Sequence, residues 1–154
     1  MDPYGRLKEA TKWMWALGDY RELARFLEPH AEALAKAVAV QPGMKVLDVA
    51  AGNGNFAIAA AKSGANVTAT DLTPKMIELG RLRTDAANLG VEWREADAEA
   101  LPFADERFDL VWSRWPTIPP AGLALPSPFD WGDPSVTVDG SLAWRRRWMS
   151  SWEW

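Results

Sequence analysis

The first 113 residues of the chain alternate between two hydrophobic patterns. From residue 19 to residue 40, apolar side chains recur every three or four positions, which predicts helix, and we expect Pro29 to open a second helix rather than lie inside one. Short apolar runs, typical of parallel strands covered on both faces, follow at 45–50, 67–71, 91–96 and 108–113. Helical patterns separate the first three runs, at 55–63 and 74–90. This alternation predicts an α/β fold with a parallel sheet.

The pattern changes after Ser113. Five prolines lie between Pro116 and Pro128, which predicts a loop or a polyproline-like stretch. Farther along, Asp139-Gly140 separates two short apolar triplets, which leaves open a hairpin over 136–144. Six of the ten tryptophans also fall in the last forty residues. We therefore expect an irregular tail rich in tryptophan and proline, in which the basic run 145–147 is solvated.

Composition and charge exclude several classes of site. The net charge of −4 disfavours a protein that holds nucleic acid or an anionic membrane mainly through its charge. There is no cysteine, and His30 is the only histidine, which excludes disulfides and the usual zinc sites. His30 fits a surface or helix-packing position better than that of a catalytic base. No segment is long and apolar enough to span a bilayer, and no signal-peptide pattern opens the chain, so we expect a cytoplasmic protein.

Acids and glycines stand where the predicted strands end. Asp48 lies in the first apolar run, Gly52 and Gly54 follow it, and Asp71 ends the second run. Glycines let the backbone approach a ligand closely, and an acid at the tip of the next strand can accept both hydroxyls of a ribose. A cofactor that contains a nucleoside is therefore the natural ligand. The spacing Gly52-x-Gly54-x-x-Ala57 also fits the dinucleotide fingerprint, but Asp48 stands where it would repel a pyrophosphate.

Four motifs in this order resemble the class I S-adenosylmethionine-dependent methyltransferases. They are the segment 48–54, Asp71, Asp97-Ala98, and the strand at 108–111 that follows a turn at 100–103. The first motif of that family reads acid-x-Gly-x-Gly-x-Gly, and in this chain an alanine replaces the first glycine. The resemblance covers about residues 13–113. It is strongest to the small-molecule branch with the methyltransferase type 11 domain, which includes the ubiquinone and menaquinone biosynthesis C-methyltransferases.

The resemblance implies roles for five positions around the glycines. Asp48 is expected near the methionine amino group of S-adenosylmethionine, where a carboxylate complements an ammonium. Ala50, Gly52 and Gly54 are expected to line the backbone that passes the methionine and the ribose. Asp71 is expected to accept hydrogen bonds from the ribose hydroxyls.

Five further positions complete the implied S-adenosylmethionine site. Leu72 and Met76 are expected to pack beside the adenine. Asp97 is expected to accept a hydrogen bond from the adenine amino group, with Ala98 beside it. Ser113 is expected to face the methionine and the transferred methyl group. No catalytic base and no metal ligand are implied, because the sulfonium of the cofactor is already a strong electrophile.

The N-terminal segment resembles the part of the family that closes over the cofactor, at Trp13, Trp15 and Asp19-Tyr20. For the two tryptophans, packing in the core is an equally open interpretation. Asp109 is expected at the start of a strand without a chemical role.

The resemblance implies a Rossmann-like parallel sheet with helices on both faces, of which this chain supplies only the strand order 3-2-1-4. We divide the chain into a helical segment at 1–40, a half-domain that binds S-adenosylmethionine at 41–113, and the tail at 114–154. Because the tail does not match the family, we interpret it as a truncation or a frameshift after residue 113. The fourth strand would then be an exposed edge, which either the tail covers or a second copy of the chain pairs with.

The leading functional prediction is methyl transfer from S-adenosylmethionine to a small-molecule acceptor, impaired by the truncation. Two alternatives stay open: an NAD(P)-dependent oxidoreductase, and a non-catalytic remnant that binds the cofactor or nothing. Neither nucleic acid nor a membrane is expected as a partner.

Overall fold

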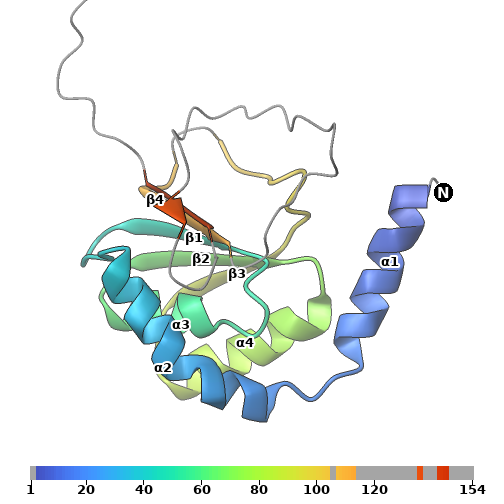
Figure 1. Ribbon diagram of the computed structural model, residues 1–154, viewed down its shortest axis with the longest axis horizontal. Coiled ribbons are helices and arrows are strands. Elements are labelled where there is room, and N and C mark those ends of the chain that lie inside the picture. The colour runs from blue at the N-terminus through green and yellow to red at the C-terminus, as the bar shows by residue number, and fades with distance from the viewer. Residues whose placement is uncertain (1–2, 105–106, 114–134, 137–141, 146–154) are drawn as a thin grey trace, which may run out of the picture.

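A computed structural model of the chain describes residues 3–104, 107–113, 135–136 and 142–145 (Figure 1). Its helices are α1 (Pro3–Ala16), α2 (Arg21–Ala37), α3 (Asn55–Lys62) and α4 (Pro74–Ala86). Its strands are β1 (Lys45–Val49), β2 (Asn66–Asp71), β3 (Val91–Glu95), β4 (Leu110–Ser113), β5 (Ser135–Val136) and β6 (Leu142–Arg145). The strands form one sheet in the order β3-β2-β1-β4-β6-β5.

The parallel part of the sheet confirms the strand order 3-2-1-4. β1 pairs in parallel with β2 and β4, and β2 pairs in parallel with β3. At the centre, Val46 lies between Val67 of β2 and Leu110 of β4. Val46 and Leu110 are fully buried, as strands covered on both faces require. The helices α3 and α4 connect β1 to β2 and β2 to β3, which are the crossovers that the alternating pattern predicts.

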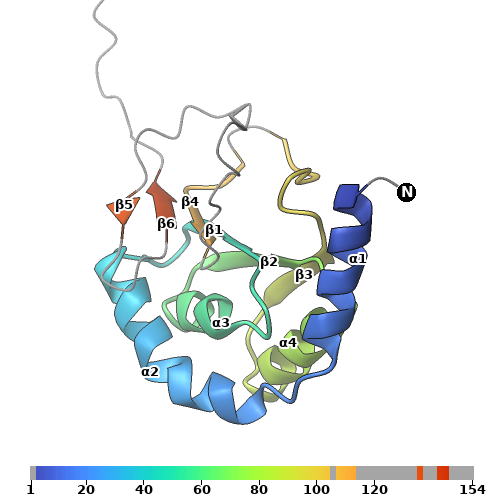
Figure 2. The same ribbon diagram turned by 45° about the vertical axis from the view of Figure 1, so that its right-hand side comes forward.

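Two antiparallel strands follow the parallel ones in the sheet. β6 pairs with β4, placing Leu142 opposite Ser113, and β5 pairs with β6 (Figure 2). The hairpin that the sequence left open over 136–144 is therefore confirmed, and the expectation of an irregular tail is wrong for these strands. Because β6 occupies the outer edge of β4, self-association through that edge loses its basis. The proline-rich stretch at 116–128 lies outside the described residues.

The helices α2, α3 and α4 pack on one face of the sheet, and α1 contacts α4, so the expectation of helices on both faces is not met among the described residues (Figures 1 and 2). α2, α3 and α4 share one core with the inward side chains of the sheet. On the opposite face, Phe103 and Phe108 meet edge to face at 5.1 Å and lie in a second cluster with Leu47 and Val49. The physical reason is that the crossovers β1-α3-β2 and β2-α4-β3 step toward the same edge of the sheet, and right-handed crossovers in one direction place their helices on one face. The β3–β4 connection, which crosses back over the sheet, forms turns and loops where it is described.

α2 runs through Pro29 as one helix, so the prediction that Pro29 opens a second helix is wrong. Pro29 lies on the exposed side of α2, while Ala24, Ala31 and Leu34 face the core. A proline on the solvent side is tolerated because helices curve away from solvent there and their hydrogen bonds are already lengthened. Neither α2 nor any other described helix has the length and apolar character needed to cross a membrane.

Candidate functional site

The carboxyl ends of the parallel strands meet at one edge of the sheet, and the predicted site residues follow them there. Residues 50–54, which we call the glycine loop, come directly after β1, and Asp71 ends β2. Asp97 lies two residues beyond β3, and Ser113 ends β4. Since β1 lies between β2 and β4, the glycine loop is central among these positions.

The glycine loop has a left-handed backbone at three positions. The φ angles are 55° at Ala50, 58° at Gly52 and 89° at Gly54. The N–H of Ala51 donates to the carbonyl of Thr70 at 2.9 Å, and the N–H of Gly54 donates to the carbonyl of Ala51 at 2.9 Å. A Cβ atom added to Gly52 would meet nothing within 4 Å. The backbone at Gly52 is therefore open to the close approach of a ligand.

Gly54 is required by packing as well as by its φ angle. A Cβ atom added there would lie 2.7 Å from the ring of Trp93, and one added to Gly80 on α4 would lie closer still to the same ring. Trp93 is 6% exposed, and its Nε1–H donates to Oγ1 of Thr84 at 3.3 Å. The two glycines make room for this indole between the start of α3 and the middle of α4. The sequence analysis missed Trp93.

Asp71 connects the glycine loop to the turn that opens α4. The N–H of Gly52 donates to Oδ2 of Asp71 at 2.8 Å, and the N–H of Thr73 donates to Oδ1 at 2.8 Å. The side chain is partly exposed. The carboxylate is therefore held in one orientation at the carboxyl edge while it stays accessible.

Asp48 lies beneath the glycine loop with 2% of its surface exposed. The N–H of Ala57, in the first turn of α3, donates to its Oδ2 at 3.0 Å. Burial raises the pKa of Asp48 to about 8; the hydrogen bond from Ala57 opposes the rise and the charge of Asp71 adds to it. Burial therefore favours the protonated acid, and the side chain supports the start of α3. Its contact with a cofactor ammonium stays a prediction.

Asp97 is held by a lysine from the N-terminal helix. Nζ of Lys8 donates to Oδ2 of Asp97 at 2.5 Å and also pairs with Glu99 at 2.5 Å. The N–H of Glu99 donates to Oδ1 of Asp97 at 3.0 Å. Burial favours the neutral acid, but the hydrogen bonds from Lys8 and Glu99 outweigh it, so the pKa of Asp97 lies below its ordinary value. The carboxylate predicted for the adenine is thus charged and contacts α1.

The remaining predicted residues differ in exposure. Met76 on α4 and Ser113 at the end of β4 are each 4% exposed. Leu72 is partly buried in the turn after β2, whereas Ala98 is exposed beyond β3. These four residues follow the same sheet edge as the glycine loop.

The N-terminal segment reaches the glycine loop through Tyr20. Nδ2 of Asn53 donates to the carbonyl of Tyr20 at 3.4 Å, and the Tyr20 ring packs against Trp15 with 5.6 Å between centroids. Trp13 is 67% exposed, so it does not belong to a core. Asp19 forms an exposed ion pair of 2.6 Å with the arginine that begins α2.

The structure also shows where Asp109 and His30 lie. Asp109 directly precedes β4, which confirms its expected position at the start of a strand, and it accepts a hydrogen bond from the N–H of Lys45 at 2.8 Å that joins the starts of β4 and β1. His30 is exposed on α2. In the described part of the chain, no group of His, Asp or Glu side chains is arranged to hold a metal ion.

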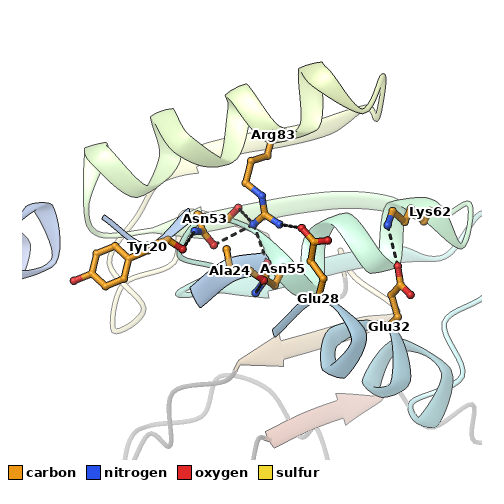
Figure 3. Close-up of polar contacts among 8 residues, drawn as sticks. All are labelled: Tyr20, Ala24, Glu28, Glu32, Asn53, Asn55, Lys62 and Arg83. Carbon is orange, nitrogen blue, oxygen red and sulfur yellow. Dashed lines mark hydrogen bonds and ion pairs between the residues drawn. The ribbon is translucent and has the colours of Figure 1, made fainter. Parts of the chain in front are cut away.

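The sequence analysis also missed an arginine behind the glycine loop. Arg83 extends from α4 toward Asn53, Asn55 and Glu28 (Figure 3). An arginine on a helix of mixed polarity gives no signal by itself. The asparagines that flank Gly54 were the only available indication.

Comparison with known proteins decides the family. A family model described as a methyltransferase domain matches residues 46–122, which is half of the chain. The chain belongs to this methyltransferase domain family. The matched range begins in β1 and contains the glycine loop, Asp71 and Asp97. The resemblance to class I S-adenosylmethionine-dependent methyltransferases is confirmed, as is the Rossmann-like sheet.

Several relatives of this methyltransferase domain can be named. An uncharacterized protein of Mycobacterium tuberculosis is 50% identical over 101 residues, covering 65% of this chain and 37% of the relative. A demethylmenaquinone methyltransferase of Clavibacter sepedonicus is 47% identical over 79 residues, covering 51% of this chain and 32% of the relative. A solved structure of a SAM dependent methyltransferase from Aquifex aeolicus has a TM-score of 0.51 at 25% identity, covering 56% of this chain and 49% of that chain.

The methyltransferase domain spans about a third of the length of the curated relatives that it matches. Truncation or a frameshift after residue 113 stays a prediction.

Proposed function

We propose that this methyltransferase domain binds S-adenosylmethionine at the carboxyl edge of its sheet and directs methyl transfer to a small-molecule acceptor. The orientation of Asp71 carries the proposal. Its carboxylate stands between the glycine loop and the turn before α4, and each oxygen accepts one backbone N–H at 2.8 Å. Each carboxylate oxygen can accept a second hydrogen bond, so Asp71 can also accept from the two hydroxyls of a ribose.

The other residues at this edge suit the remaining parts of the cofactor. The open backbone at Gly52 allows close approach, and the charged Asp97 is an acceptor for an amino group on the adenine. Leu72 offers apolar contact from the turn after β2, Met76 is buried on α4, and Ser113 lies at the end of β4. When bound, the cofactor supplies the electrophilic methyl group. The chain then has to bind, orient and exclude water, which contributes up to roughly 7–11 kcal/mol in favourable cases.

Calorimetric titration tests the cofactor directly. S-adenosylhomocysteine and NAD are titrated separately into the same sample of the full chain. We expect binding of S-adenosylhomocysteine and none of NAD. Binding of NAD alone would favour the oxidoreductase, and binding of neither would leave the non-catalytic remnant.

The acceptor is tested by transfer of a labelled methyl group. Because one relative is named a demethylmenaquinone methyltransferase, demethylmenaquinone is the first acceptor to try. We expect label in the acceptor with the unaltered chain and, at a limiting cofactor concentration, about tenfold less with Asp71→Ala. A cytoplasmic location and the absence of nucleic-acid partners stay predictions of the sequence.

A further inference from the structure

Arg83 joins three elements behind the glycine loop (Figure 3). Its Nη1 donates to the backbone carbonyl of Asn53 at 2.8 Å, to Oδ1 of Asn53 at 3.1 Å and to Oδ1 of Asn55 at 2.8 Å. Its Nη2 donates to Oε1 of Glu28 on α2 at 2.7 Å. One guanidinium from α4 therefore contacts the glycine loop, the first residue of α3 and the middle of α2.

The two asparagines that accept hydrogen bonds from Arg83 also donate hydrogen bonds to the segment that begins α2. With their oxygens accepting from Arg83, their amide nitrogens are free to donate elsewhere. Nδ2 of Asn53 donates to the carbonyl of Tyr20 at 3.4 Å, and Nδ2 of Asn55 donates to the carbonyl of Ala24 at 3.2 Å. Each amide is thus fixed at both ends, which defines its orientation.

The glycine loop needs such a support. Ala50, Gly52 and Gly54 all have positive φ angles, and glycine gains the most freedom when a loop is released. The backbone of the glycine loop makes few hydrogen bonds among the described residues. Asp71 restrains the loop from the side of β2 only. The contacts of Arg83 restrain it from the helix side. The Arg83 side chain is 22% exposed, and Glu28 compensates the partly buried charge.

We propose that Arg83 is a positioning residue that holds the glycine loop in its ligand-binding conformation through Asn53 and Asn55. The proposal rests on the proposed cofactor function. Arg83 acts on cofactor affinity by reducing the number of loop conformations that must be lost on binding. Glu28 orients the guanidinium and docks α2 at the same time.

Amide hydrogen exchange on the unliganded chain is the first measurement. The N–H groups of Ala51 and Gly54 are hydrogen-bonded in the loop, so their protection reports loop order without any cofactor. We expect Arg83→Gln to lower this protection about tenfold. The matched control is Lys62→Gln, because Lys62 also joins α3 to α2, through Glu32 at 2.9 Å, but does not contact the loop. It should leave the protection unchanged.

Affinity for S-adenosylhomocysteine is the second measurement. Arg83→Gln should weaken it about tenfold, and Arg83→Lys should recover only part of the loss, because an ammonium cannot reproduce the guanidinium fork. In a chain that already carries Asn53→Ala and Asn55→Ala, the further change Arg83→Gln should have a clearly smaller effect, because the bond to the Asn53 backbone carbonyl is the one contact with these two residues that remains. If Arg83→Gln still weakened the affinity for S-adenosylhomocysteine by the full tenfold in that background, the proposal that Arg83 acts through the two asparagines would be overturned.

The two measurements separate this proposal from the cofactor proposal. If the unaltered chain binds no S-adenosylhomocysteine but Arg83→Gln still loosens Ala51 and Gly54, the loop support stands and the cofactor function fails. If the chain binds the ligand and Arg83→Gln changes neither exchange nor affinity, the positioning role is overturned. Equal loosening by Lys62→Gln would also overturn it, because helix docking alone would then explain the effect.

Discussion

The N–H of Gly52 donates to Oδ2 of Asp71 at 2.8 Å, so the acid that ends β2 holds the loop that follows β1. The second oxygen of Asp71 accepts from the N–H of Thr73 at 2.8 Å. One carboxylate thus fixes both turns that border the proposed ribose position. Asp71 supports the glycine loop, and under the proposed function it also binds the ribose, so a substitution there is expected to remove both contributions.

Asp71→Ala is expected to weaken binding of S-adenosylhomocysteine by about tenfold or more. Loss of charge-assisted hydrogen bonds to the ribose hydroxyls costs roughly 1.5–3 kcal/mol, and release of the glycine loop adds to this. Calorimetry measures the affinity, and circular dichroism checks that the fold persists. The control is Asp85→Ala, an exposed acid in the last turn of α4. Unchanged affinity in a folded Asp71→Ala protein would remove the cofactor assignment.

Gly52→Val is expected to abolish cofactor binding while the helices and strands remain. The φ of Gly52 is 58°, which a β-branched residue rarely adopts, and its side chain would enter the open space above the loop. Gly43→Val is a matched control, because Gly43 has a φ of 82° and equally open surroundings but lies in the turn before β1. Gly43→Val should strain the backbone but still bind S-adenosylhomocysteine. Full binding by Gly52→Val would mean that the glycine loop is only a turn.

Asp48 makes the stability of the domain depend on pH. Its pKa is about 8 in the folded chain, against an ordinary value of 3.8. Below about pH 4 the folded and unfolded chains both hold the proton. Between pH 4 and 8 only the folded chain holds it, so the free energy of unfolding should fall as the pH rises through this range.

Asp48→Asn should remove that pH dependence and stabilise the domain at pH 8, since an amide oxygen can still accept from Ala57. Urea unfolding at pH 5 and pH 8 measures the effect, with the exposed Asp85→Asn as a control. If the free energy of unfolding changed with pH equally in the Asp48→Asn and unaltered chains, this role of Asp48 would be contradicted. A loss of S-adenosylhomocysteine affinity in Asp48→Asn would support the predicted contact with the methionine ammonium.

Gly80→Ala is expected to destabilise the domain although alanine favours helix by about 1 kcal/mol over glycine. The new Cβ would overlap the ring of Trp93, which is buried and cannot move freely. Overpacking of this kind costs about 1–3 kcal/mol. Gly90→Ala meets nothing within 4 Å and should be neutral or stabilising. A Gly80→Ala chain with a higher unfolding midpoint would show that the indole adapts.

Much of this fold follows from local patterns, but not all of it. The apolar runs around Val46 and Leu110 predict buried parallel strands because each must be covered on both faces. The path of α2 through Pro29 could not be predicted, because its stability comes from packing of Ala31 and Leu34 rather than from local propensity. Which face a helix covers is decided by the direction in which each right-handed crossover steps across the sheet, so it depends on the strand order of the whole sheet and not on the composition of the helix.

The candidate site shows the same division. The motifs placed Asp71, Gly52 and Asp97 at one sheet edge, because strand ends in a parallel sheet converge. The roles of Arg83 and Trp93 depend on contacts between distant segments. An arginine that binds Asn53 of the glycine loop and Asn55 of α3 has the same local sequence as one in solvent, so only the folded chain distinguishes them.

The outer edge of β4 gives a final prediction. β6 pairs with this edge along its whole length, from Leu110 to Ser113. Removing residues 114–154 would leave the N–H and carbonyl groups of that edge without their strand partner, next to the buried Trp112. We expect the shortened chain to self-associate. A chain ending at residue 145 keeps β5 and β6 and should have the same number of copies per particle as the full chain. Light scattering after gel filtration measures both. A shortened chain with the same mass per particle as a single copy would show that β4 is stable as an uncovered edge.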